Sequence, residues 1–197
     1  MKDKTLPEPT EWDFNCMAWH EAGHATCSMF LAGRPPIERV SITPGDDAYG
    51  FMRTSPGNRL NSTRESLVYD IAVELSGIVS ERLFLGLVTT SGGSDLCAAY
   101  SIAHGMVVRF GMGSTVGFAC PGFAPERQVS AFFSRNAAKV ESDIAEIIGT
   151  AQRIAEENLA TNASTVRAIA NALLQKRTLD GNALMEILKR GDLTARP

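Results

Sequence analysis

The sequence predicts a mainly α-helical domain that carries one small β hairpin or sheet. Apolar residues recur at three- and four-residue spacing along most of the chain, which is typical of helices with one buried face. The exception is two short extended runs that are joined by turn-forming residues. A length of 197 residues with 44% hydrophobic residues is consistent with one globular domain. We assign that domain to residues 13–191, with short tails at residues 1–12 and 192–197.

The first helix is expected from about Asp13, where apolar residues begin to recur every three or four positions. Gly33 and the two prolines that follow it should end this helix, because proline cannot continue one. The extended runs come next, over residues 37–43 and 49–53. Pro44 and Gly45 begin the turn between them, so we expect the two runs to pair.

Five further helices are expected in the rest of the chain. Ser62 with Glu65 three residues later fits a capping box for the first of these, and Gly86 should end it. Ser94 can cap the next helix, which should run to about Phe110. The remaining helices are marked by apolar periodicity and are expected near residues 140–154, near residues 166–174, and from Asp180 onward.

Charge, apolar segments and cysteine content indicate which partners and which cellular compartment to expect. Lys and Arg number 19 against 22 Asp and Glu, which gives no reason to expect nucleic acid or an anionic membrane as the main partner. The N-terminal segment has no apolar core of a signal peptide, and no apolar stretch of about 20 residues predicts a membrane span. The cysteines form no dense pattern and suggest reduced thiols of a cytoplasmic protein; they are Cys16, Cys27, Cys97 and Cys120.

A metal-binding pattern lies within the first expected helix. His20 and His24 are four residues apart, which places them about 40° apart around a helix axis. Both imidazoles therefore leave one face and can bind one Zn²⁺ ion. Glu21 lies beside that face and can act as the general base toward an attacking water.

A third protein ligand has to come from elsewhere in the chain. The position six residues after the second motif histidine is Phe30, which excludes the class of zinc enzymes with a third histidine there. Asp95 lies at an expected helix start, where the helix dipole favours an ionised carboxylate. Glu74 and Glu81 share another helix face and are rivals to Asp95, while His104 is more typical of an ordinary helix residue. Periodicity alone leaves this ligand open.

Several separate motifs resemble the peptidase domain of the FtsH family of ATP-dependent zinc metalloproteases. Residues 18–25, Ala-Trp-His-Glu-Ala-Gly-His-Ala, are similar to the signature of that family. Residues 39–44 and 49–51 resemble its following strands, and residues 89–96, Thr-Thr-Ser-Gly-Gly-Ser-Asp-Leu, resemble the segment that supplies its third ligand. Residues 178–181 resemble its C-terminal element, so the likeness extends over about residues 17–190.

The resemblance implies a set of site residues. His20, His24 and Asp95 would be the ligands of Zn²⁺ and Glu21 the catalytic base, so Asp95 is favoured over its rivals by resemblance and not by spacing. Glu81 aligns with an acidic position near the site. The chain departs from the family where an arginine is replaced by Ile78, where an asparagine is replaced by Ser94, and where a helix arginine is replaced by His104.

The resemblance also implies an activity and partners. We expect a zinc-dependent endopeptidase that hydrolyses flexible or unfolded polypeptides, and residues 49–53 could hold such a substrate as an added strand. No P-loop of the form G-x-x-x-x-G-K-[S/T] occurs, so we expect a peptidase domain without the family's ATPase domain, with a separate ATPase or a homo-oligomer as partner. The alternative is a non-catalytic zinc-binding interaction module.

Overall fold

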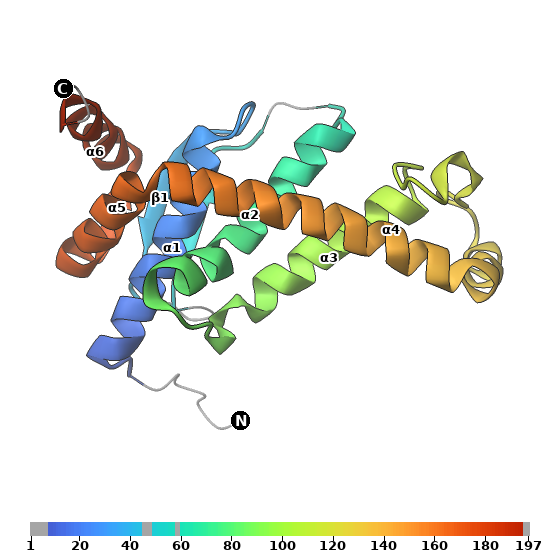
Figure 1. The fold of residues 1–197 in the computed structure, drawn as a ribbon, viewed down its shortest axis with the longest axis horizontal. Helices are drawn as coiled ribbons and strands as arrows, with labels where there is room; N and C mark the ends of the chain where they lie inside the picture. Colours follow the sequence, from blue (N-terminus) through green and yellow to red (C-terminus); the bar gives the residue numbers. More distant parts are fainter. Residues whose placement is uncertain (1–7, 45–48, 58–59, 195–197) are drawn as a thin grey trace. The chain divides into compact units, whose positions relative to one another are not determined.

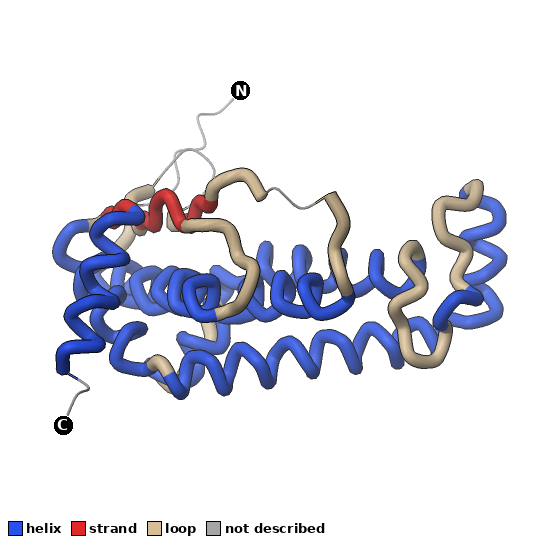
Figure 2. Tube along the Cα trace, turned by 90° about the horizontal axis from the view of Figure 1, so that it is seen from above, coloured by secondary structure: helices blue, strands red, loops and turns tan. Residues whose placement is uncertain are grey.

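The computed structural model describes residues 8–44, 49–57 and 60–194, and it confirms a mainly α-helical fold with a small sheet. Figure 2 shows the strands gathered in one small patch of the otherwise helical chain. The elements in chain order are α1 (Glu11–Phe30), β1 (Ile37–Ser41), β2 (Phe51–Thr54), α2 (Arg64–Ser80), the π-helical turn η1 (Glu81–Leu85), the 3-10 turn η2 (Thr90–Gly92), α3 (Gly93–Val108), the 3-10 turn η3 (Gly117–Ala119), α4 (Glu126–Thr161), α5 (Ala163–Lys176), β3 (Thr178–Asp180) and α6 (Gly181–Thr194).

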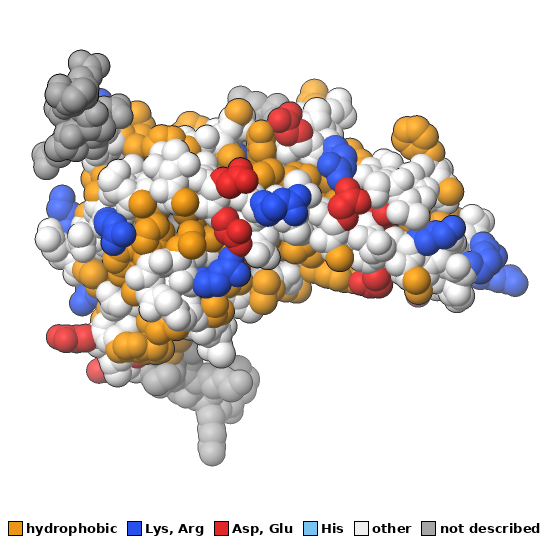
Figure 3. Space-filling model, in the orientation of Figure 1, with side chains coloured by type: hydrophobic (Ala, Val, Ile, Leu, Met, Phe, Trp, Pro, Cys, Tyr) orange, Lys and Arg blue, Asp and Glu red, His pale blue; other side chains and the backbone are white. Residues whose placement is uncertain are grey.

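The chain forms two compact units. Of the described residues, the first unit comprises 8–44, 49–57, 76–91 and 156–194, and the second comprises 60–75 and 92–155. Helices α2 and α4 each contribute residues to both units. None of the helices in the described parts of the chain combines the length and the apolar character that crossing a bilayer requires. On the face drawn in Figure 3, basic and acidic side chains are intermixed.

Helix α1 is the central helix of the first unit. It begins at Glu11, two residues before the expected start, because Thr10 and Asp13 form a capping box in which each side chain accepts a hydrogen bond from the other's backbone N–H. It ends at Phe30, ahead of Gly33 in the left-handed region. Its middle is buried on all sides, since α1 packs against α5, β1 and β2 (Figure 1).

The sheet has the strand order β2-β1-β3, and β1 is antiparallel to both neighbours. The predicted hairpin is confirmed, with Val40 opposite Met52; residues 45–48 of its turn lie outside the described residues. Strand β3 was not expected from the sequence, and it places Leu179 opposite Val40 on the other side of β1. Asp180 opens the last helix as predicted, because its side chain accepts a hydrogen bond from the backbone N–H of Ala183 at 2.8 Å.

Two predicted helix caps were wrong. Thr63, and not Ser62, precedes α2, and the Thr63 hydroxyl accepts a hydrogen bond from the Ser66 N–H while the Ser66 hydroxyl accepts one from the Thr63 N–H. This exchange satisfies two backbone donors at a register one residue later than the predicted pair. Ser94 lies inside α3, because η2 leads directly into this helix and Gly92 occupies the capping position.

The second unit holds α3 against the first part of α4. The hydroxyl of Tyr100 on α3 donates a hydrogen bond to Glu141 on α4 at 3.2 Å. His104, also on α3, stacks between the rings of Tyr100 and Phe133, with centroids 6.1 and 5.4 Å away. His104 is therefore part of an aromatic stack, as expected for an ordinary helix residue.

Candidate metal centre

Helix α1 brings the two motif histidines together. The Nε2 atoms of His20 and His24 are 3.0 Å apart, and the two residues are only 5% and 8% exposed. Two imidazole ligands of one tetrahedral Zn²⁺, each with a Zn–N distance of about 2.0–2.1 Å, would be separated by about 3.3 Å. The spacing of the two rings therefore suits the binding of a single ion between them.

The outer ring nitrogens have partners of their own. His20 Nδ1 lies 2.7 Å from Oε1 of Glu81, and His24 Nδ1 lies 3.4 Å from the hydroxyl of Ser76. A carboxylate can only accept a hydrogen bond, so His20 carries its proton on Nδ1 and presents the lone pair of Nε2. Partners of this kind fix the orientation of histidines that ligate metals.

Glu81 is completely buried at the start of the π-helical turn η1. Its carboxylate also accepts hydrogen bonds from the backbone N–H of Thr89 at 2.6 Å and from the hydroxyls of Thr89 and Ser91 at 3.1 and 2.9 Å. Burial raises the pKa of Glu81, but the hydrogen bonds from His20, Thr89 and Ser91 outweigh burial and bring the pKa below its usual value. The group beside His20 is therefore an ionised carboxylate.

Gly77 on α2 lets both imidazole rings pack closely against the backbone of that helix. A Cβ atom at this position would lie 2.6 Å from His24 Nε2 and in contact with His20 Nε2. Real Cβ atoms do not approach other heavy atoms this closely, so any other residue here would collide with both imidazole rings. The two histidines can therefore lie where they do only because position 77 has no side chain.

The candidate base lies close to the edge of the sheet. Glu21 is 6% exposed, and a Cβ at Gly50, the residue before β2, would lie 2.7 Å from its Oε1. The backbone that leads into β2 thus passes directly beside the Glu21 carboxylate. His20, Glu21 and His24 come from α1, and this part of the site belongs to the first unit.

Asp95 and Glu74, two of the acidic candidates for the third ligand, belong to the second unit. Asp95 lies in the first turn of α3, where the sequence predicted it, and its side chain is half-buried. Glu74 is a half-buried residue of α2.

The structure shows contributors that sequence reasoning missed. Neither the role of Gly77 nor the hydrogen bonds of Ser76, Thr89 and Ser91 was expected, since a small residue in a helix or loop carries no periodic signal. Glu81 was noted as an acidic position near the site, and its contact with His20 places it there.

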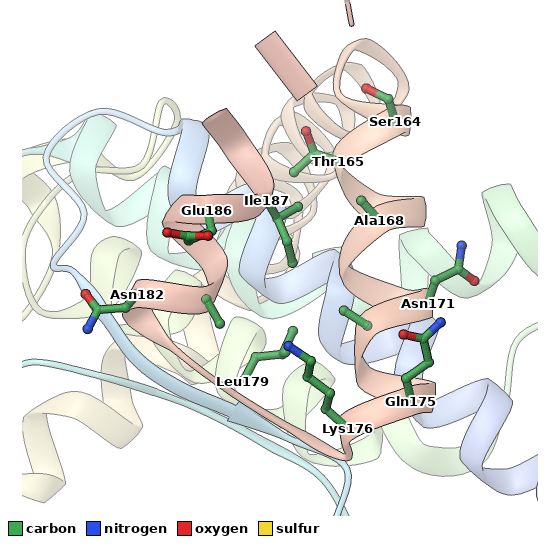
Figure 4. A pocket seen from close by; sticks show the side chains of 12 residues that line it. Ser164, Thr165, Ala168, Asn171, Gln175, Lys176, Leu179, Asn182, Glu186 and Ile187 are labelled. Carbon is green, nitrogen blue, oxygen red and sulfur yellow. The ribbon is translucent and has the colours of Figure 1, made fainter. Parts of the chain in front are cut away.

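A groove in the first unit lies between α5 and α6 and has a volume of about 860 Å³. Figure 4 shows Asn171, Gln175 and Lys176 on the α5 side and Asn182 and Glu186 on the α6 side. None of the expected site residues lines this groove. It is therefore distinct from the histidine pair.

Comparisons with known proteins identify the family. Residues 10–187 match Peptidase family M41. The chain is 31% identical over 191 residues to an ATP-dependent zinc metalloprotease FtsH of Veillonella parvula. This alignment covers 91% of this chain and 29% of that protein. It is 32% identical over 178 residues to an FtsH of Rhodothermus marinus, with 87% of this chain and 26% of that protein covered. A mitochondrial inner membrane m-AAA protease component, AFG3L2 of Mus musculus, is 30% identical over 175 residues, with 87% of this chain and 22% of that protein covered.

The chain thus spans less than a third of the length of these relatives. The match to the family covers nearly the whole chain, including both motif histidines, Glu21 and Asp95. The two FtsH relatives are zinc metalloproteases by name, and the spacing of the two imidazoles suits the coordination of zinc. The chain belongs to Peptidase family M41.

Proposed function

We propose that this chain is a zinc-dependent endopeptidase in which His20, His24 and Asp95 bind Zn²⁺ and Glu21 is the general base. The observation that carries the proposal is the convergence of two buried Nε2 atoms, 3.0 Å apart, close to the separation of two imidazole ligands of one zinc ion.

Asp95 is the better candidate for the third ligand than Glu81. The Glu81 carboxylate contacts Nδ1 of His20, on the opposite side of the ring from Nε2, and it is already engaged by Thr89 and Ser91. Asp95 lies in the first turn of α3, where unpaired backbone N–H groups favour an ionised carboxylate. The resemblance of residues 89–96 to the ligand segment of the FtsH family supports the same choice.

Bound zinc would supply a Lewis acid that polarises the peptide carbonyl and increases the acidity of the attacking water. The side chains of this protein would transfer the protons and orient the ligands. Glu21 accepts a proton from the water while the water oxygen attacks the peptide carbon. Glu21 then delivers that proton to the leaving nitrogen. One water is consumed, one C–N bond breaks, and the products are a carboxylate and an amine. The Glu81 carboxylate holds His20 in its ligating orientation throughout.

The substrate is proposed to be a flexible or unfolded polypeptide. Strand β2 is an edge strand of the described sheet, and the backbone before it passes beside Glu21. An extended peptide that paired with β2 would therefore lie next to the base, and only a chain free of its own structure can pair in this way. The FtsH relatives are named ATP-dependent, so an ATPase as partner is a further proposal. A homo-oligomeric assembly and a cytoplasmic location are proposed as well.

The proposal is tested by metal analysis and peptidase assays on the purified protein. We expect about one zinc per chain in the wild type and in Glu21→Gln, since the base is not a ligand. Casein should be cleaved by the wild type and not by Glu21→Gln. Asp95→Asn should lose most of the zinc. Zinc retained by the wild type without cleavage of any polypeptide would instead indicate a non-catalytic zinc-binding module.

A further inference from the structure

Two consecutive residues of α1, Trp19 and His20, are both contacted by one turn of chain. Phe84 of η1 stacks on Trp19, with ring centroids 5.3 Å apart and an interplanar angle of 22°. Glu81, the first residue of η1, lies 2.7 Å from Nδ1 of His20. The hydroxyl of Ser80, just before the turn, donates a hydrogen bond to the carbonyl of Trp19 at 2.6 Å. The turn is therefore attached at three points to the start of the histidine motif.

The π-helical geometry of η1 depends on these contacts. π-helical turns are rare inside helices and often occur at functional sites, which indicates that packing must favour them over the continuation of an α-helix. Glu81 begins this turn, and Gly86 ends it in the left-handed region. If residues 81–85 relaxed to α-helical geometry, Phe84 would move relative to Trp19. The carboxylate of Glu81 would then lose its fixed position at His20.

A side chain of helix α5, Arg167, also contacts the Phe84 ring. The guanidinium carbon of Arg167 lies 5.3 Å from the centre of the Phe84 ring, a distance typical of a cation–π contact. Helix α5 packs against α1, so Arg167 approaches from an element that is already fixed to the histidine helix (Figure 1). Trp19, Phe84 and Arg167 together form what we name the aromatic column.

We infer that the aromatic column holds η1 in its π-helical geometry, so that Phe84 and Arg167 are positioning residues that act on the metal site through Glu81. This inference rests on the proposed function, because it takes His20 to be a zinc ligand. None of the column's three side chains is among the proposed zinc ligands or the proposed base. Loss of the column would leave both histidines in place on α1 but would remove the packing that holds η1 beside them. The Glu81 carboxylate would then be held only by its hydrogen bonds from Thr89 and Ser91, so that the orientation of His20 would be less strictly fixed.

The affinity for zinc, measured by competition with a chromogenic chelator, tests the inference. Phe84→Ala should weaken zinc binding about tenfold, within the range typical of lost partners of metal ligands. Phe84→Tyr keeps the ring and should bind zinc like the wild type. Phe133→Ala is the matched control, because Phe133 is a half-buried member of the aromatic stack at His104 and belongs to the second unit. It should lower stability without changing zinc affinity.

A double-mutant cycle separates positioning from a general loss of structure. If Phe84 acts through Glu81, Phe84→Ala should have little further effect on zinc affinity in a Glu81→Gln background. An equal tenfold loss in both backgrounds would contradict the inference. Arg167 is exposed, so its variants should fold whether or not Phe84→Ala does. Arg167→Ala should weaken zinc binding about twofold and Arg167→Lys should restore it.

The outcomes distinguish the inference from the proposed function beneath it. A wild-type protein that binds no zinc would contradict the proposed function. A wild type that binds zinc no more tightly than folded Phe84→Ala and Arg167→Ala would overturn the aromatic column's role and leave the proposed function standing. Cobalt substituted for zinc adds a spectroscopic measurement, since the visible bands of a changed ligand geometry should shift in Phe84→Ala and not in Phe133→Ala.

Discussion

The carboxylate of Glu81 and the imidazole of His20 meet at 2.7 Å although the two residues are 61 positions apart in the chain. The side chain of Glu81 is fully buried and that of His20 nearly so. A buried carboxylate is costly unless it is hydrogen-bonded, and here His20, Thr89 and Ser91 all donate to it. The arrangement therefore serves to fix one tautomer and one orientation of His20.

Replacing Glu81 by glutamine should lower the affinity for zinc. Glu81→Gln keeps the shape of the side chain but removes the charge that favours the proton on Nδ1 of His20. We expect a 10- to 100-fold loss of zinc affinity, measured by chelator competition. Glu74→Gln is the control, because Glu74 on α2 was the other glutamate considered as a rival ligand, and this variant should retain its zinc. A larger loss in Glu74→Gln than in Glu81→Gln would contradict this assignment of roles.

Zinc should also stabilise the folded protein. A metal that binds only the native state adds about 2.7 kcal/mol when its free concentration is 100 times its dissociation constant, which corresponds to a rise in Tm of about 5–10 °C for a chain of this size. Thermal unfolding with and without a chelator measures this difference. Glu21→Gln should keep the whole shift and His24→Ala should lose it. An identical Tm with and without zinc in the wild type would rule out a native-state site.

The sequence allowed the prediction of those features that depend on local spacing. The common face of His20 and His24 follows from their four-residue separation, and the hairpin from its extended runs and turn formers. Strand β3 has only three residues, and its position is set by pairing with β1, which lies far away in the chain. A segment so short has no detectable period.

The same limit applies to the site. Glu81 could be recognised as a rival ligand from its helix face, but whether it would face Nδ1 or Nε2 of His20 depends on tertiary packing. The π-helical turn that begins at Glu81 changes the helical phase assumed in any spacing argument, and nothing in residues 81–85 signals it. Long-range contacts therefore had to come from the structure.

Asp143 should make the second unit sensitive to acid. It is 1% exposed on α4 and accepts hydrogen bonds from the backbone N–H groups of Thr115 at 2.9 Å and Val116 at 2.8 Å, and from the hydroxyl of Ser114 at 3.1 Å. Burial raises the pKa of Asp143, but these hydrogen bonds outweigh burial and bring the pKa below its ordinary value of 3.8. A lowered native pKa means that the ionised group stabilises the fold above the ordinary pKa. That stability is lost as the pH falls from the ordinary pKa through the lower pKa of the native state.

Asp143→Asn should therefore lower the free energy of unfolding by about 2 kcal/mol at neutral pH, because two backbone donors lose a charged acceptor. The difference from the wild type should shrink as the pH falls below about 4, because the unfolded wild type takes up a proton there and the native carboxyl takes one up at lower pH. Denaturant unfolding at several pH values measures this trend. Glu141→Gln, an exposed neighbour on the same helix, should change stability little at any pH. A difference between Asp143→Asn and the wild type that stays constant down to pH 2 would contradict the ionised state of Asp143.

Gly77→Ala should abolish zinc binding although it adds only one methyl group. The new Cβ would lie 2.6 Å from His24 Nε2 and in contact with His20 Nε2, so it would displace the two imidazole rings that we propose as ligands. The matched control is Gly149→Ala, because Gly149 is also inside a helix, α4, and an added Cβ there meets nothing within 4 Å. Alanine in an open helical position stabilises by about 0.5–1 kcal/mol, so this control should keep its zinc and unfold at a slightly higher temperature. Zinc content by atomic absorption and Tm by circular dichroism give both results, and Gly77→Ala with a full complement of zinc would show that the ion binds elsewhere.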